Sequence, residues 1–260
     1  MYKQPPGFRV CAGPVTIREM TRESSNIAGN LSRIRERIER AAARAGRSTG
    51  DITLVAVSKT FPVEAIQEAY AAGARHFGEN RVQEWESKQS HVASLEAFWH
   101  LVGHLQSNKA ARAVKLFHTV DSLDSLDLAR RLDRAVASGP EQSRTPRLRV
   151  LIEVQLDPAP AKSGVSDIEL PALIDGVMSL PHLELHGLMG VPPPFGDADR
   201  VRPAFRRLRE LRDAAAAQTG LTLPVLSMGM SHDFEAAVEE GATEVRIGTA
   251  VFGARRIDVA

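Results

Sequence analysis

The sequence has very little cysteine, few aromatic residues and no long apolar segment. Cys11 is the only cysteine among the 260 residues, so no disulfide can form within the chain and a reducing compartment is expected. Lys and Arg total 33 against 32 Asp and Glu, a balance that argues against a nucleic-acid-binding protein. No apolar run has the length of a signal peptide or a membrane span. We therefore expect a cytoplasmic protein without nucleic-acid or membrane partners, and we take it as a monomer.

The first residues differ in composition from the rest of the chain. Residues 1–24 include Pro5-Pro6-Gly7 and Gly13-Pro14, which favour a flexible N-terminal extension. Residues 25–260 are expected to form one domain. An extra helix opens it, capped by Ser25 or Asn26, because apolar residues recur there at three- and four-residue spacing: Ile27, Leu31, Ile34 and Ile38.

From Asp51 onward, segments typical of strands alternate with segments typical of helices. Apolar, β-branched runs predict strands at 52–58, 75–77, 98–102, 117–120, 148–156, 183–188, 223–226 and 243–247. Helical periodicity predicts helices at 62–72, 81–89, 108–114, 123–137, 168–178, 199–219 and 233–240. Strands separated by helices pair in parallel, and eight such units close a barrel. We predict a single α/β domain, a (β/α)8 TIM barrel, with a doubly wound open sheet as the alternative.

One apolar strand ends abruptly on a lysine. The run from Leu54 to Val57 is followed by Ser58, Lys59 and Thr60. In barrels of this kind ligands bind where the strands end, and a lysine beside an apolar core is partly desolvated, which favours the free amine that condenses with carbonyls. Lys59 is therefore a Schiff-base candidate. The alternative is a strand-end lysine whose ammonium group reaches solvent.

Polar residues and glycines follow nearly every predicted strand. Besides Lys59, the segments expected at the same mouth are 78–80, 103–104, 121–122, Gln155, 189–190, 227–231 and 246–249, and such a concentration is typical of a site. Hydroxyls and glycines mark the last two segments, which contain Ser227, Gly229, Ser231, Gly248 and Thr249. Because phosphate sites in barrels are frequently built from these two loops, they predict an anion site. A simple N-cap and a simple turn are the alternatives for Ser231 and Gly248.

An amine facing an anion site suggests two chemistries. One is an aldolase that forms a Schiff base with a sugar phosphate, and the other is a protein that holds pyridoxal 5′-phosphate (PLP) on the lysine. Arg246 bears on the choice, because a guanidinium facing the pyridine nitrogen of PLP would keep that nitrogen unprotonated. Arg246 could equally form an ion pair at the strand end. The residues alone leave both chemistries open.

Seven ordered motifs resemble those of the pyridoxal phosphate homeostasis proteins, also called the proline synthetase co-transcribed family. They are VSKT (57–60), FGEN (77–80), WHLVGHLQSNK (99–109), HTVDS (118–122), KSG (162–164), LSMGMS (226–231) and VRIGTAVFG (245–253). The resemblance runs from about Asn26 to Arg255. It implies a barrel similar to the N-terminal domain of alanine racemase, with PLP held on Lys59 as an internal aldimine.

The resemblance also implies the surroundings of the cofactor. Phosphate contacts would come from Ser227, Gly248 and Thr249, Arg246 would lie near the pyridine nitrogen, and Asn80 would lie near the cofactor. Gly229 and Gln155 complete the expected cofactor site. Gln155 departs from the family pattern, in which we expect asparagine, and its amide is one methylene longer.

The function that the resemblance implies is PLP homeostasis rather than a reaction. Family members are described as carriers or regulators of PLP and amino-acid balance, so we expect storage, delivery or buffering of PLP, apo-PLP enzymes as recipients, and no established catalytic residues. A PLP-dependent racemase-like enzyme and a cofactor-free aldolase are the alternatives. Racemisation needs a second acid or base on the opposite face of the cofactor. Few residues follow Arg255 to form a further domain, and Tyr2 and Tyr70 are not at predicted strand ends.

Three further features have simple structural interpretations. His100 and His104 could transfer protons, but a histidine paired with an aspartate or a backbone carbonyl is favoured. The arginines of the 199–219 helix indicate a solvated face. No spacing of Cys and His indicates a metal site.

Overall fold

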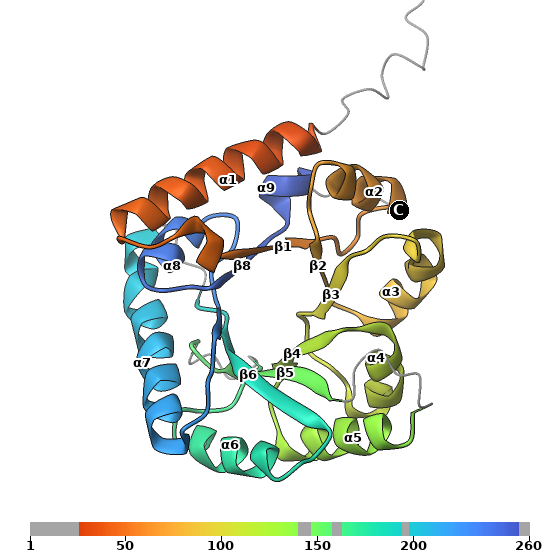
Figure 1. Ribbon diagram of the computed structural model, residues 1–260, viewed down its shortest axis with the longest axis vertical. Coiled ribbons are helices and arrows are strands. Elements are labelled where there is room, and N and C mark those ends of the chain that lie inside the picture. The colour runs from red at the N-terminus through yellow and green to blue at the C-terminus, as the bar shows by residue number, and fades with distance from the viewer. Residues whose placement is uncertain (1–25, 140–146, 158–162, 194–197, 255–260) are drawn as a thin grey trace, which may run out of the picture.

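The computed structural model describes residues 26–139, 147–157, 163–193 and 198–254, so the expected N-terminal extension lies outside the described residues. Within them, eight parallel strands form one closed barrel in the order of the chain (Figure 1). The predicted (β/α)8 barrel is confirmed, and the open-sheet alternative is wrong. The strands are β1 (Thr53–Val57), β2 (His76–Glu79), β3 (Phe98–Leu101), β4 (Thr119–Leu123), β5 (Leu148–Val154), β6 (Leu183–Gly190), β7 (Val225–Ser227) and β8 (Glu244–Ile247).

Helices surround the barrel on the outside (Figure 1). They are α1 (Ile27–Arg44), α2 (Val63–Ala71), α3 (Val82–Lys88), α4 (Ala110–Leu116), α5 (Leu126–Ala137), α6 (Leu170–Met178), α7 (Arg202–Thr219), α8 (Phe234–Glu239) and α9 (Thr249–Phe252). Each predicted helix is present, and α9 is an additional short helix that the sequence pattern did not predict. Within the described ranges, no helix is both long enough and apolar enough to span a membrane.

The barrel closes where the first strand pairs with the last. Thr53 of β1 lies opposite Glu244 of β8, and Ala56 lies opposite Ile247. We call this β1–β8 junction the seam. α1 covers it from outside, because its buried apolar face packs against α2, α8 and α9 (Figure 1). The side-chain amide of Asn30 also donates to the carbonyl oxygen of Val251 in α9 at 2.8 Å.

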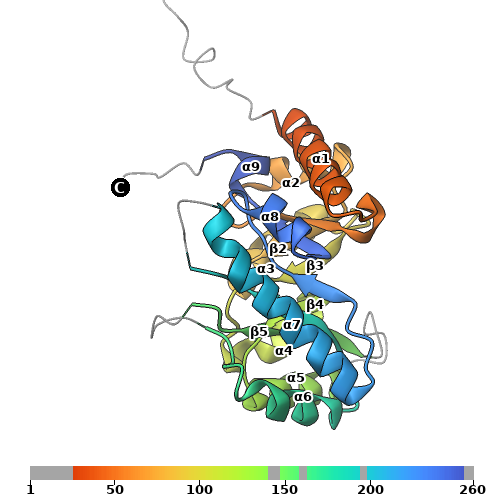
Figure 2. The same cartoon turned by 90° about the vertical axis from the view of Figure 1, so that its left-hand side faces the viewer.

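α7 is held by ion pairs along much of its length. Arg202 pairs with Glu239 at 2.6 Å and Arg206 with Glu240 at 3.1 Å, which ties α7 to the end of α8, its neighbour on the outside of the barrel (Figure 2). Arg209 donates to the backbone carbonyl of Glu240 at 2.8 Å. Arg206 and Arg207 nevertheless keep more than half of their side chains exposed. The expected solvated face is therefore confirmed there, and the structure adds the ion pairs to carboxylates about 30 residues further along the chain.

Several strands run further than the sequence predicted. β2 continues to Glu79, β4 to Leu123 and β6 to Gly190, so Asp121 and Ser122 are fully buried within β4. Their expected position at the mouth is wrong. A polar residue ordinarily ends a buried strand, but here Asp121 is accommodated because His100 of β3 pairs with it inside the barrel at 2.9 Å.

Candidate functional site

A cavity of about 340 Å³ opens at the carboxyl ends of the strands. Its volume lies in the range of small-molecule sites. The cavity collects residues that follow β1, β2, β3, β6, β7 and β8, together with one side chain each from β1 and β8. The lining residues are Val57, Lys59, Asn80, Val102, Val191, Met230, Ser231, His232, Arg246, Gly248 and Thr249.

Lys59 is placed by a tight turn after β1. Ser58, the preceding residue, is fully buried and donates its hydroxyl to Glu79 at 2.8 Å, so successive side chains point in opposite directions and Lys59 lines the cavity. Thr60 has φ 67°, a left-handed conformation that costs about 1–2 kcal/mol for a residue with a Cβ. Its backbone N–H is satisfied by the Glu84 carboxylate of α3. The turn therefore fixes the direction in which Lys59 leaves the strand.

The loops after β7 and β8 form the wall that adjoins Lys59 across the seam. The Ser231 hydroxyl accepts a hydrogen bond from the backbone N–H of Ala250 at 3.2 Å, which joins the two loops. Gly248 approaches β1 so closely that a Cβ there would lie 3.2 Å from the carbonyl oxygen of Val57. Ser231 and Thr249 each bring a hydroxyl to the cavity lining. This wall can therefore bind an anion with hydroxyl and backbone groups.

Arg246 forms the floor of the cavity. It is only 5% exposed, and it donates to the Ser227 hydroxyl at 2.6 Å and to the Gly190 carbonyl at 3.0 Å. Burial lowers the pKa of the guanidinium from its ordinary value, while the Glu244 carboxylate opposes the shift. Because arginine remains protonated in proteins, the floor presents a fixed positive charge. Arg246 is held by side-chain and backbone partners inside the barrel rather than by an ion pair at the strand end.

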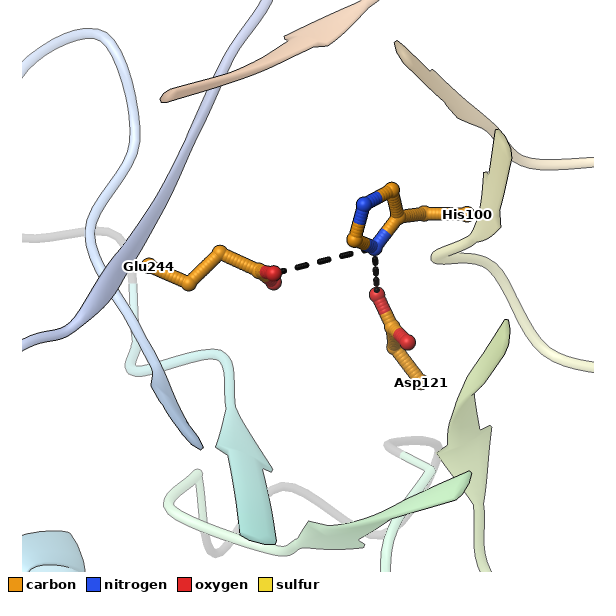
Figure 3. Close-up of side chains that lie close together, drawn as sticks. All are labelled: His100, Asp121 and Glu244. Carbon is orange, nitrogen blue, oxygen red and sulfur yellow. Dashed lines mark hydrogen bonds and ion pairs between the residues drawn. The ribbon is translucent and has the colours of Figure 1, made fainter. Parts of the chain in front are cut away.

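Beneath Arg246 lies a buried group of three ionisable side chains, shown in Figure 3. His100, Asp121 and Glu244 point toward one another from β3, β4 and β8 (Figure 3), and His100 Nδ1 lies 2.9 Å from Asp121 and 3.7 Å from Glu244. We call these residues the axial cluster. The expected pairing of His100 with an aspartate is confirmed, as is that of His104, whose partner is Asp124 at 3.0 Å.

Five of the eight predicted cofactor residues come together in the cavity lining: Lys59, Asn80, Arg246, Gly248 and Thr249. The other three lie elsewhere. Ser227 is fully buried and donates its hydroxyl to Glu244 at 2.6 Å, and a Cβ at Gly229 would lie 2.5 Å from that of Ala237. Gln155 is half-buried, and its backbone N–H donates to Val165 at 2.9 Å.

Two residues of the site were not singled out by the sequence reasoning. His232 lines the cavity, and Glu244 supports Arg246 through Ser227. The spacing of Glu244, Arg246 and Gly248 contains a usable signal, because alternate residues of a strand share one face. Once Arg246 is assigned to the inside of the barrel, Glu244 must lie there too.

The fold and the site together define a class of protein: a barrel of the alanine racemase type with a lysine at the end of its first strand. The family model described as "Alanine racemase, N-terminal domain" matches residues 29–256. An alanine racemase from Corynebacterium glutamicum has the same fold, with a TM-score of 0.61 at 22% identity over 90% of this chain and 62% of that chain.

More similar proteins narrow the class. A pyridoxal phosphate homeostasis protein from Pseudomonas aeruginosa is 46% identical over 231 residues, covering 89% of this chain and 96% of the relative. The structure of PipY from Synechococcus elongatus PCC7942, solved with PLP bound, has a TM-score of 0.75 at 37% identity and covers 88% of this chain and 100% of that one. The chain belongs to the family of pyridoxal phosphate homeostasis proteins, as its motifs indicated.

Glu79 is an unusual buried carboxylate next to the Lys59 turn. One of its oxygens accepts from Ser58, whereas the other, Oε2, has no hydrogen-bond partner among the described residues. The Nζ atom of Lys88 lies 3.5 Å from the other oxygen, Oε1. Burial raises the pKa of Glu79 to about 7, with Lys88 and Ser58 opposing the shift. The folded state therefore binds a proton that the unfolded state releases near the ordinary glutamate pKa.

Replacement of Glu79 should change how stability depends on pH. Because the folded pKa is raised, the contribution of Glu79 is fully favourable below the unfolded pKa and is lost as pH rises through about 7. Glu79→Gln should reduce the fall in unfolding free energy between about pH 5.5 and pH 8 by about 2 kcal/mol, measured by urea unfolding. The exposed control Glu64→Gln should keep the wild-type slope. Equal slopes for Glu79→Gln and wild type would contradict the assignment.

Proposed function

We propose that this chain holds PLP in the cavity at the carboxyl ends of its strands, attached to Lys59, and that it stores, delivers or buffers the cofactor. The observation that carries the proposal is the presence, in one cavity, of Lys59, the Arg246 guanidinium and the hydroxyl-bearing wall at Ser231 and Thr249. The relative PipY, of the same fold, has been solved with PLP bound. In this proposal residues 25–260 form the PLP-binding barrel and residues 1–24 are an extension.

The residues present fit PLP in three respects. Lys59 supplies the amine that condenses with the aldehyde, releasing one water. Arg246 presents a donor-only group that stabilises an unprotonated pyridine nitrogen. Ser231, Gly248 and Thr249 supply a hydroxyl and backbone wall suited to a phosphate. This differs from the expectation from the sequence in one residue, because the Ser227 hydroxyl is used by Glu244 and Arg246, and Ser231 takes its place in the proposal.

Holding the cofactor is favoured over turnover. When bound, PLP supplies an electron sink for amino-acid chemistry, and racemisation additionally needs a protein acid or base on each face. Among the described lining residues, the titratable groups are Lys59, His232 and Arg246, and Arg246 keeps its proton. Tyr70 lies in α2 and stacks with Arg75 at 4.1 Å. These observations favour a carrier over a racemase-like enzyme, and the PLP-bound relative favours it over a cofactor-free aldolase. In this proposal the carrier is cytoplasmic and monomeric and serves apo-PLP enzymes.

Lys59 should be the only site of a reducible linkage to PLP. Lys59→Ala should abolish the visible absorbance band that develops when PLP is added, and it should remove the mass gain after borohydride treatment, since no amine then faces the cavity at that point. The control Lys115→Ala changes an exposed lysine of α4 and should behave as wild type. Borohydride labelling that persists at full stoichiometry in Lys59→Ala would show that another lysine is used.

The Thr249 hydroxyl should contribute to phosphate binding specifically. Thr249→Val should weaken the affinity for PLP by roughly 10- to 100-fold, because a hydrogen bond to a charged group is lost, whereas Thr249→Ser should stay close to wild type. Pyridoxal, which has no phosphate, should bind both variants as it binds wild type. Titration by absorbance checks both ligands. A loss of the same size for pyridoxal would place the phosphate elsewhere.

A comparison of transfer with exchange separates a carrier from an enzyme. The PLP-loaded protein should restore activity to an apo-PLP enzyme in the presence of a trap for free PLP. It should not exchange the Cα hydrogen of added amino acids with deuterium from the solvent, because the proposal assigns no acid or base to the face opposite Lys59. The Lys59→Ala variant controls for free cofactor. Rapid exchange at Cα would favour the racemase-like alternative.

A further inference from the structure

The axial cluster is connected to the floor of the cavity by an unbroken chain of contacts. Arg246 donates to Ser227 at 2.6 Å, Ser227 donates to Glu244 at 2.6 Å, and Glu244 lies 3.7 Å from His100 Nδ1. His100 in turn pairs with Asp121 at 2.9 Å. These five residues are each at most 5% exposed. Any change in charge within the cluster is therefore felt at Arg246 with little screening by water.

The directions of these hydrogen bonds are fixed by chemistry. Arginine can only donate, so the single proton of the Ser227 hydroxyl goes to Glu244. Burial and Asp121 raise the pKa of Glu244, against the effects of His100, the Ser227 hydroxyl and Arg246. Asp121 accepts from the Thr119 hydroxyl at 2.8 Å as well as from His100. With Asp121 and Glu244 both ionised, the two carboxylates outnumber the single guanidinium of Arg246 and leave one negative charge in excess. An imidazolium at His100 brings the buried group to neutrality, the condition under which buried charges are tolerated.

The second nitrogen of His100 is also engaged. Its Nε2 lies 3.0 Å from Nδ1 of His76, which lines a separate cavity of about 620 Å³ together with Phe98 and His118. Burial and the neighbouring His100 lower the pKa of His76 to about 4, so His76 is neutral at physiological pH and its Nδ1 can accept a hydrogen bond from His100. An imidazolium at His100 thus donates from both nitrogens, to Asp121 and to His76.

The surrounding charges agree with this assignment. His100 is faced by His76 from β2, by Asp121 from β4 and by Glu244 and Arg246 from β8. Burial and Arg246 act to lower its pKa, but the two carboxylates more than offset them and the pKa is raised. Glu153 of β5, which also faces Arg246, accepts from Ser163 at 2.7 Å, and burial raises its pKa.

We infer that His100 is a charged positioning residue, which fixes the Arg246 guanidinium on the cavity floor through the Glu244 carboxylate. When His100 is positively charged, the Glu244 carboxylate is partly neutralised by it. The positive charge of Arg246 can then act on a ligand in the cavity. With His100 neutral, Glu244 would offset Arg246 and the cavity would lose its positive floor. The part of this inference that concerns the ligand rests on the proposed PLP site.

The protonation of His100 can be measured on the ligand-free protein. In ¹⁵N-labelled wild type, both ring nitrogens of His100 should carry protons from about pH 6 to about pH 8, with the signal assigned by its absence in His100→Asn. This measurement does not depend on PLP, so it separates a failure of this inference from a failure of the proposed function. A single protonated nitrogen at neutral pH, or a metal ion bound to the cluster in stoichiometric amount, would overturn the inference.

The effect on the cavity can be tested by compensating the charges. His100→Asn leaves one excess negative charge and should weaken PLP binding by about tenfold or more, whereas the double variant with Glu244→Gln is neutral again and should return to within about threefold of wild type. The control His182→Asn changes a half-exposed histidine paired with Asp133 at 3.2 Å and should have no effect. A purely structural role predicts that the two substitutions add, so a double variant weaker than either single one would overturn the inference.

Discussion

Charge pairing inside the barrel is the constraint on which the rest of this structure depends. The interior of a small barrel is ordinarily filled by branched apolar side chains, but here β3, β4, β7 and β8 direct ionisable or hydroxyl groups toward the axis. Buried charges of this kind are stable only when each has a partner. The pairing therefore determines where Arg246 lies, and Arg246 forms the floor of the cavity.

The repeating pattern of strands and helices could be predicted from the sequence, and so could the position of Lys59 at the end of the first strand. Parallel strands buried on both faces give apolar runs that stand out from their surroundings, and a lysine at the end of such a run is conspicuous. The ends of the strands were harder to locate. Asp121 and Ser227 look like residues that terminate strands, because a sequence does not show whether a polar side chain has a buried partner. Those partners, His100 and Glu244, come from other strands, and only the closed barrel brings them together.

The site combines a rigid floor with walls made of loops. Arg246 and the axial cluster lie on strands, where backbone pairing holds them, whereas Lys59, Ser231 and Thr249 follow strands. The turn at Thr60 is held from α3 by the Glu84 carboxylate, and the β7 and β8 loops are joined by the bond between Ser231 and Ala250. Rigid support of this kind suits a protein that binds one cofactor in one orientation.

The site can form only after the seam between β1 and β8 has closed. Lys59 follows the first strand and Gly248 and Thr249 follow the last, so the two walls become neighbours only when the ends of the barrel pair. During synthesis, the lysine would emerge long before the residues that face it. A ligand that contacts both walls stabilises the closed barrel, because it binds the complete fold and not partly folded chains. Loading with cofactor would then report that a chain has finished folding.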